Sequence, residues 1–410
     1  MPKYFTRSRK LPFFTVFTLI LRNSVKSLQL MLNEFVLHSK KDHTITASAF
    51  SQARKKLKHT AFIELNDDIV LLYYKEEEYK KLYGLRLLAF DGSKLTLPNT
   101  EEIKQTFGTT AVGNHTSHDL GEYSRATFEA CYDVLNNIAV KSVLAKGNVY
   151  EVNLATEMLD TFNDKDLLIY DRGYASYHFF ACLGQKKLNY LIRCPKGSLP
   201  AVQAMFKENS PIDNIATITA PARQGKRIKS LGLPPAIKVR LVKVLLSTGE
   251  VEVLATSLMD SKKFPTGIFA GLYHLRWGVE TFFSKIKGRL GLENFTGKSV
   301  EAIKQDFWST IFISNLETIM TEDIEANVKV EYSEKQQKRA INKAVSFNAI
   351  KNLAFEILST KKDKSEIMTK LTDLFLTNMT AVRKKRIVPR NKISDTRSLN
   401  FQKRFRKHVF

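Results

Sequence analysis

Two apolar runs that each lead into an aspartate constrain this chain most. LRLLAF (85–90) precedes Asp91, and DLLIY (166–170) precedes Asp171. Short apolar runs bounded by turn residues predict buried strands, and a helical pattern at 152–162 predicts a parallel crossover into the second strand. Open α/β sheets place ligands beyond the carboxyl ends of such strands. We therefore expect an α/β sheet in which two strands each end in an aspartate, although an Asp before Gly is by itself ordinary turn chemistry.

The residues around these two strands predict the rest of the sheet. Apolar and polar residues alternate over 124–134, and residues 138–144 return as a partner strand after an Asn-Asn pair suited to a tight turn. Residues 176–194 predict a further helix and strand. Three β-rich stretches between 196 and 260 predict an antiparallel insert. The pattern indicates a mixed sheet flanked by helices.

The charge of the chain points to a polyanionic partner. Its 410 residues hold 64 Lys and Arg against 41 Asp and Glu, a net charge of +23. The excess is concentrated in 381–410, with eleven basic residues against one acid, and in 196–243, with nine against two. Neither segment has the amphipathic apolar face of a membrane binder. We therefore expect nucleic acid as the partner and no membrane.

The N-terminus and the cysteines indicate a cytoplasmic protein. The apolar run at 11–21 follows a basic stretch like that of a signal peptide. It is too short to span a bilayer and no small-residue cleavage site follows it, so we interpret it as the first core helix. Cys131, Cys182 and Cys194 form no CxxC motif, which favours reduced core residues.

Two weaker patterns each leave two interpretations open. Residues 48–58 predict a short helix with Arg54 and two lysines facing outward, which would suit either a DNA groove or a solvated basic face. His115 and His118 are spaced like a pair of metal ligands, but in a polar, irregular segment (98–123) such a pair is more often exposed and inert.

The segment 273–287 carries four polar residues at helical spacing. Tyr273, Arg276, Glu280 and Lys287 share an arc of about 60° at 100° per residue, directly beside an apolar stripe. A carboxylate among cations suits a metal ion on Glu280 with Arg276 and Lys287 on phosphate oxygens. An ordinary amphipathic helix with an Arg276–Glu280 pair explains the same spacing.

Asp91, Asp171 and Glu280 together favour the first interpretation. A strand with Asp, a hairpin, a helix, a second strand with Asp and a later helix with Glu is the order in which ribonuclease H-like folds assemble a metal site. Three carboxylates can hold two Mg²⁺ about 3.5 to 4 Å apart for phosphoryl transfer, with Mn²⁺ as a substitute.

These motifs resemble those of the DDE transposases of bacterial insertion sequences, in the insertion-sequence-four family. The signature of that family is Tyr, two residues, Arg, three residues, Glu, six residues, Lys, and residues 273–287 match it without a gap. DGS at 91–93 and DRGY at 171–174 match its two Asp motifs. The resemblance implies that Asp91, Asp171 and Glu280 bind metal and catalyse, and that three further residues hold DNA phosphates: Tyr273, Arg276 and Lys287.

The resemblance also implies an activity. Such a protein would bind the terminal inverted repeats of its element as a homodimer, cleave a strand to expose a 3′-OH and join it to target DNA, in the cytoplasm at the nucleoid. Two alternatives stay open: a catalytically silent DNA-binding protein derived from a transposase, and a ribonuclease H-fold nuclease without end specificity.

Five parts of the chain follow from this resemblance and from the patterns above. We expect a helical N-terminal DNA-binding domain, a ribonuclease H-like catalytic domain in two segments, a β-strand insert, a helical C-terminal region and a basic tail. Their predicted limits are, in that order, 1–80, 81–195 with 261–325, 196–260, 326–380 and 381–410.

In one respect the sequence departs from some relatives. Those relatives use a Trp in the insert to stack a flipped base while the DNA end closes as a hairpin, whereas Trp277 and Trp308 lie outside the insert. Phe206 or Phe264 could stack instead, or could be core residues. A hairpin intermediate therefore stays an open question.

Overall fold

The computed structural model describes most of the chain. The residues it describes are 5, 11–22, 26–38, 44–111, 122–246, 248–335, 337–359 and 364–382. The chain divides into two compact units. The helical unit comprises Met1–Lys75, Leu95–Arg125 and Ser284–Phe410, and the sheet unit comprises Glu76–Lys94 and Ala126–Phe283.

A mixed sheet forms the centre of the sheet unit. Its strands run in the order β2-β3-β1-β5-β6-β9-β8-β7, where β2 is the short strand Thr109–Ala111, and β4 lies beside β3. The parallel strands at its centre are β1 (Arg86–Thr96), β5 (Asp166–Tyr170) and β6 (Asn189–Cys194). The antiparallel strands are β3 (Glu122–Asp133), β4 (Ile138–Lys146), β7 (Asp213–Thr219), β8 (Ala236–Leu245) and β9 (Val251–Thr256).

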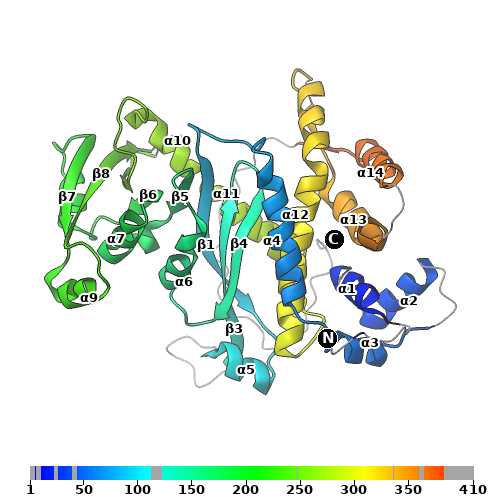
Figure 1. The fold of residues 1–410 in the computed structure, drawn as a ribbon. Coiled ribbons are helices and arrows are strands. Elements are labelled where there is room, and N and C mark those ends of the chain that lie inside the picture. Colours follow the sequence, from blue (N-terminus) through cyan, green and yellow to red (C-terminus); the bar gives the residue numbers. More distant parts are fainter. Residues whose placement is uncertain are drawn as a thin grey trace. The chain divides into compact units, whose positions relative to one another are not determined.

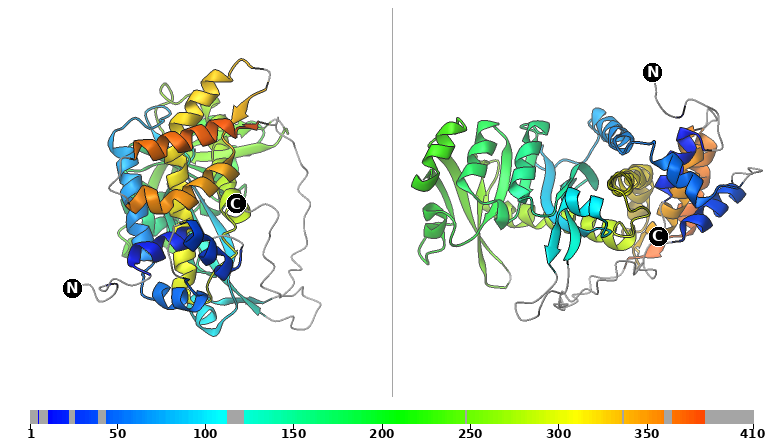
Figure 2. Two further views of the ribbon diagram at one scale, coloured as in Figure 1. Left: turned by 90° about the vertical axis from the view of Figure 1, so that its right-hand side faces the viewer. Right: turned by 90° about the horizontal axis from the view of Figure 1, so that it is seen from below.

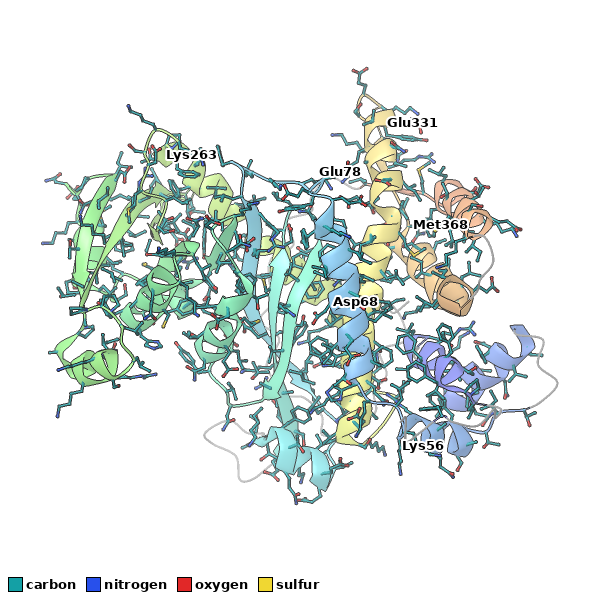
Figure 3. All side chains as sticks on the ribbon, in the orientation of Figure 1. Lys56, Asp68, Glu78, Lys263, Glu331 and Met368 are labelled. Atoms are coloured by element: carbon teal, nitrogen blue, oxygen red, sulfur yellow. The ribbon has the colours of Figure 1, made fainter. Side chains whose placement is uncertain are left out.

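Helices cover both faces of this sheet, which explains why every residue of β5 is buried. Helices α6 (Glu151–Met158) and α7 (Tyr177–Gln185) lie on one face, and α10 (Phe269–His274) and α11 (Trp277–Ser284) on the other (Figures 1 and 2). Side chains fill the space between the layers (Figure 3). The predicted mixed sheet flanked by helices is confirmed.

The strands predicted between 196 and 260 are β7, β8 and β9. They are antiparallel, as expected, and β9 also pairs with β6, so these strands continue the main sheet. Buried Arg240 on β8 binds both Asp213 carboxylate oxygens, at 2.9 and 2.6 Å, and the carbonyls of Leu258 and Phe264. This residue therefore ties the strands to the loop that leads into α10.

One strand differs from the sequence prediction. β1 does not end at Asp91 but continues to Thr96. Its parallel register with β5, in which Ala89 pairs with Ile169, stops where β5 ends, while β3 still accompanies β1. Asp91 therefore lies within a strand that keeps only one neighbour there.

The helical unit is built around a long helix. Its main helices are α1 (Phe13–Leu21), α2 (Leu28–His38), α3 (Ala47–Arg54), α4 (Thr60–Lys75), α12 (Val300–Glu331), α13 (Lys343–Ser359) and α14 (Ser365–Thr377). Every residue of α1 from Thr15 to Leu21 is buried, which confirms it as a core helix. None of the helices in the described ranges is long and apolar enough to cross a membrane.

Several finer expectations have mixed outcomes. The sequence pattern predicts a helix over 300–321, and α12 extends ten residues further, to Glu331. The stretch 98–123, expected to be irregular, contains helix α5 (Glu101–Phe107) and the short strand β2 (Thr109–Ala111). The prediction that Arg54 faces outward is wrong, because it is buried. His115, His118 and the basic residues of the tail lie outside the described residues.

The structure also shows how far the cysteines and the two candidate stacking residues are buried. All three cysteines are free, with Cys131 and Cys194 buried and Cys182 half-buried. Phe264 is a core residue, 6% exposed, and Phe206 is half-buried.

Candidate active site

The first acid of the site, Asp91, lies on β1 near the end of the parallel pairing. The register that joins Ala89 to Ile169, continued by two residues, brings Asp91 level with Asp171. The backbone N–H of Gly92 donates to Asp91 Oδ1 at 3.0 Å. The Asp91 side chain is only 22% exposed. Pairing between parallel strands therefore brings these two aspartates together, as the sequence predicted.

The second acid, Asp171, caps a single turn of 3-10 helix, Arg172–Tyr174. Its Oδ1 accepts a hydrogen bond of 2.7 Å from the N–H of Gly173. A Cβ at Gly173 would lie 3.0 Å from that same oxygen, so a glycine suits the turn. The DRGY motif thus forms a tight turn directly after β5 that fixes the carboxylate of Asp171.

The third acid, Glu280, lies on α11, and the segment around it is not the single regular helix that the sequence predicted. α10 ends at His274, and the N–H of Arg276 donates to Tyr273 O at 3.0 Å in a tight turn before α11 begins. After Ser284 the chain continues as a π-helix, Lys285–Arg289. A regular α-helix of 100° per residue therefore does not describe how the four polar residues of the signature are arranged.

Arg276 is the cation of the site. Its Nη2 donates to Glu280 Oε1 at 2.8 Å, and its Nη1 lies 3.6 Å from Asp91 Oδ2. The guanidinium also lies over the rings of Tyr273, at 6.0 Å, and Trp277, at 5.1 Å. Arg276 is buried, yet its Nε has no hydrogen-bond partner among the described residues. This single arginine thus connects the strand that carries the first acid to the helix that carries the third.

The acids influence one another electrostatically. The pKa of Asp91 is raised from 3.8 to about 6, and burial is the main cause; the charges of Asp171 and Glu280 add to the rise, while Arg276 opposes it. The carboxylates from three distant parts of the chain therefore share one local field.

This donor set fits a hard divalent cation. Mg²⁺ prefers carboxylate oxygens and keeps several waters, so a few carboxylates are enough to hold it. Asp91, Asp171 and Glu280 supply oxygens of this kind, and the side chain of Asp91 is largely shielded from bulk water. Within the described ranges no three His, Cys, Asp or Glu side chains form a ready ligand group, and the guanidinium of Arg276 lies between Asp91 and Glu280.

The two remaining signature residues have different surroundings. Tyr273 belongs to α10 and packs into the core at 6% exposure, and burial raises its pKa to about 12. Lys287 belongs to the helical unit, where its Nζ lies 4.0 Å from Glu293. Their assignment to DNA phosphates stays a prediction. The neighbouring Trp277 exposes 43% of its surface.

The structure adds a residue that the sequence analysis did not single out. Glu129 on β3 is completely buried and accepts a hydrogen bond of 2.7 Å from the hydroxyl of Tyr174, the last residue of DRGY. Burial raises the pKa of Glu129 to about 9. Its signal in the sequence was a carboxylate between Thr127 and Cys131, on the strand face opposite the apolar one.

Comparisons with known proteins agree with these motifs. The family described as the transposase DDE domain matches residues 83–316, more than half of the chain. The transposase InsG for insertion sequence element IS4 of Escherichia coli (strain K12) is 24% identical over 280 residues, which are 66% of this chain and 60% of that relative. A piggyBac transposase, in a synaptic complex with hairpin DNA, aligns with 98% of this chain and 81% of its own at a TM-score of 0.46 and 10% identity. The chain therefore belongs to the DDE transposase family, with similarity to transposases of the IS4 type.

Proposed function

We propose that this protein binds the terminal inverted repeats of its own element and catalyses metal-dependent cleavage and strand transfer of DNA. The observation that carries the proposal is that Asp91 interacts electrostatically with both Asp171 and Glu280, while Arg276 contacts Asp91 and Glu280. Phosphoryl transfer needs such a cluster, because both the attacking and the leaving oxygen develop charge.

Each residue has a role in this proposal. Asp91, Asp171 and Glu280 would hold two Mg²⁺ ions, or Mn²⁺ in their place. The bound metal would activate the attacking oxygen and stabilise the leaving oxygen. Arg276 would pair with a DNA phosphate through its two Nη groups, because a guanidinium matches phosphate oxygens. Tyr273 and Lys287 would contact neighbouring phosphates.

The net charge of +23 supports double-stranded DNA as the substrate. A homodimer would hold the two ends of the element together, one end at each site. The predicted domains keep their roles in this proposal: the helical N-terminal part and the basic tail would bind DNA, and the domain that contains the sheet would cleave it. The basic residues would bind the phosphates of both the element ends and the target DNA. Recognition of the end sequence would require additional contacts to bases.

Cleavage of a duplex carrying the inverted repeat, with a scrambled duplex beside it, tests the proposal. Asp91→Asn should bind the repeat like wild type but cleave at least about 10³-fold more slowly, because several kcal/mol of charge stabilisation are lost. Asp68→Asn, at an exposed position on α4 (Figure 3), removes the same charge and should cleave normally.

Each alternative activity gives a distinct result in this assay. Equal cleavage by Asp91→Asn and wild type would refute the assigned catalytic role. Binding without any Mg²⁺-dependent cleavage would indicate a silent DNA-binding protein. Equal cleavage of the repeat and the scrambled duplex would indicate a nuclease without end specificity.

A further inference from the structure

The turn that carries Asp171 is held at three points. The carboxylate of Asp171 itself accepts from Gly173 N–H at 2.7 Å. The hydroxyl of Tyr150 donates to the carbonyl of Gly173 at 3.0 Å. The hydroxyl of Tyr174 donates to Glu129 Oε1 at 2.7 Å. The first two bonds join the turn to itself and to the start of α6, and only the third joins it to β3.

Glu129 reaches this turn from the face of the sheet opposite Glu280. Phe128, its neighbour on β3, packs against Phe282 and Phe283 of the α11 helix. Because successive side chains of a strand point to opposite faces, Glu129 points away from α11. It lies behind the candidate active site and has no exposed surface.

The aromatic surroundings of Tyr174 leave its hydroxyl little freedom. Its ring lies 5.0 Å from that of Tyr170 and 5.9 Å from that of Phe179, and the side chain is 1% exposed. A buried hydroxyl that loses its acceptor is costly. The bond to Glu129 therefore determines where the end of the Asp171 turn sits against the sheet.

We propose that Glu129, through its hydrogen bond with Tyr174, is a positioning residue that holds the Asp171 carboxylate in place for metal binding. This inference rests on the proposed function, because it assigns Asp171 to a metal ion. Residues behind the ligands of a metal fix their orientation, and losing one weakens metal affinity by about 10- to 100-fold.

The charge state of Glu129 suits this role. Burial, and then the charges of Glu151 and Asp91, raise its pKa to about 9, while its bond to Tyr174 and Lys94 oppose the rise. Glu129 is therefore neutral at pH 7 and does not compete with Asp171 for a cation. Its Oε2 has no hydrogen-bond partner in the part of the chain that the structure describes. An amide can consequently replace the acid, since only Oε1 is used.

A titration of the protein with Mn²⁺ at pH 7 tests the role. The loss of the electron paramagnetic resonance signal of the free ion measures how much Mn²⁺ is bound. Tyr174→Phe should weaken the Mn²⁺ affinity of the Asp91-dependent site by about tenfold. Tyr170→Phe is the matched control, because the Tyr170 hydroxyl is buried in the same aromatic cluster and makes no hydrogen bond among the described residues. Equal affinities of the two variants would overturn the proposal.

Variants of Glu129 identify the group that Tyr174 needs. Glu129→Gln keeps a carbonyl acceptor and should stay within about twofold of wild type, whereas Glu129→Leu should match Tyr174→Phe. The double variant Glu129→Leu/Tyr174→Phe should then be no weaker than either single variant. If Glu129→Gln instead loses Mn²⁺ as completely as Asp91→Asn does, Glu129 is a ligand and the positioning role is wrong.

The same experiments separate this inference from the proposed function. If wild type binds Mn²⁺ through Asp91 but cleaves no DNA, the proposed function fails, while the comparison of Tyr174→Phe with Tyr170→Phe still decides the positioning role. If wild type cleaves DNA and Tyr174→Phe binds Mn²⁺ normally, only the positioning role fails. Absence of any Asp91-dependent Mn²⁺ binding overturns both.

Discussion

Each unit of the molecule contains a buried arginine that bonds to carboxylates, and the two differ in how well they are satisfied. Arg54 in the helical unit and Arg276 in the sheet unit are both 6% exposed. Arg54 donates through all three of its nitrogens, to Gln305, Thr296, the carbonyl of Ala302 and Asp306, at 2.5 to 2.9 Å.

Arg276 has a poorer set of partners. It makes one hydrogen bond of 2.8 Å, to Glu280, and its contact with Asp91 is 3.6 Å long, beyond hydrogen-bond range. Its buried Nε makes no hydrogen bond with any of the described residues. A buried charge that is fully bonded joins parts of a fold, while one with unused donors costs stability and remains available to a ligand. The contrast supports the proposal that Arg276 binds a DNA phosphate, whereas the fully bonded Arg54 serves folding.

The largest expected effect comes from removing each arginine in turn. Arg54→Met leaves the fully buried Asp306 without its cation and should lower the free energy of unfolding by about 3 to 5 kcal/mol. Arg276→Met should cost about 1 kcal/mol or less, since Asp91 and Glu280 keep 22% and 30% of their side-chain surface in water. Urea unfolding of both variants measures the difference.

The effects of the two substitutions on DNA cleavage should have the opposite order to their effects on stability. Arg276→Met should lose cleavage of the inverted-repeat duplex while remaining folded, and Arg54→Met should retain it at a temperature where the variant is folded. Equal losses of stability would break the comparison, because both arginines would then be structural.

The sequence could predict the acids but not the state of the arginines. Asp91, Asp171 and Glu280 were found because strand patterns and motif spacing depend on neighbours along the chain. Arg54 was placed outward by its helical period, since the sequence does not show that Asp306, some 250 residues away, would bury it. Partners so distant in the chain are decided by tertiary packing.

The same limit applies to local geometry and to Glu129. Spacing suggested one helix from 273 to 287, but packing breaks it before Trp277 and continues it as a π-helix after Ser284. The sequence places the end of β1 at Asp91 because Asp-Gly is typical of a turn. In the structure β1 continues beside β3 to Thr96. Glu129 gains its partner only when β5 and β3 enter the same sheet.

The pH dependence of stability sharpens the comparison at the acid beside Arg276. The pKa of Asp91 is raised from 3.8 to about 6 on folding, so the folded state holds its proton more tightly than the unfolded state. The shift favours folding at low pH, and this stabilisation is lost as pH rises from 3.8 through about 6. The loss lowers the free energy of unfolding by at most about 3 kcal/mol. Asp91→Asn removes it.

Metal-free wild type should therefore lose stability relative to Asp91→Asn as pH rises from 4 to 7. Chemical unfolding of both proteins along this range measures the difference, and the shared contribution of Glu129 cancels. A constant difference between the two proteins would show that Arg276 satisfies Asp91 as fully as Arg54 satisfies Asp306.

The smallest expected effect concerns the glycine that lets α11 approach the sheet. A Cβ at Gly278 would lie 3.0 Å from Val134 Cγ1 and 3.2 Å from its Cβ, whereas a Cβ at Gly271 of α10 would meet nothing within 4 Å. Gly278→Ala should cost about 1 kcal/mol net, because overpacking exceeds the helical gain of alanine, and Gly271→Ala should stabilise by about 0.5 to 1 kcal/mol. Since Gly278 lies in the first turn of the helix that carries Glu280, its variant should also slow cleavage about tenfold by shifting that carboxylate from its partners. Thermal unfolding and cleavage of both variants test this, and normal cleavage by Gly278→Ala at reduced stability would show that the position of α11 tolerates the shift.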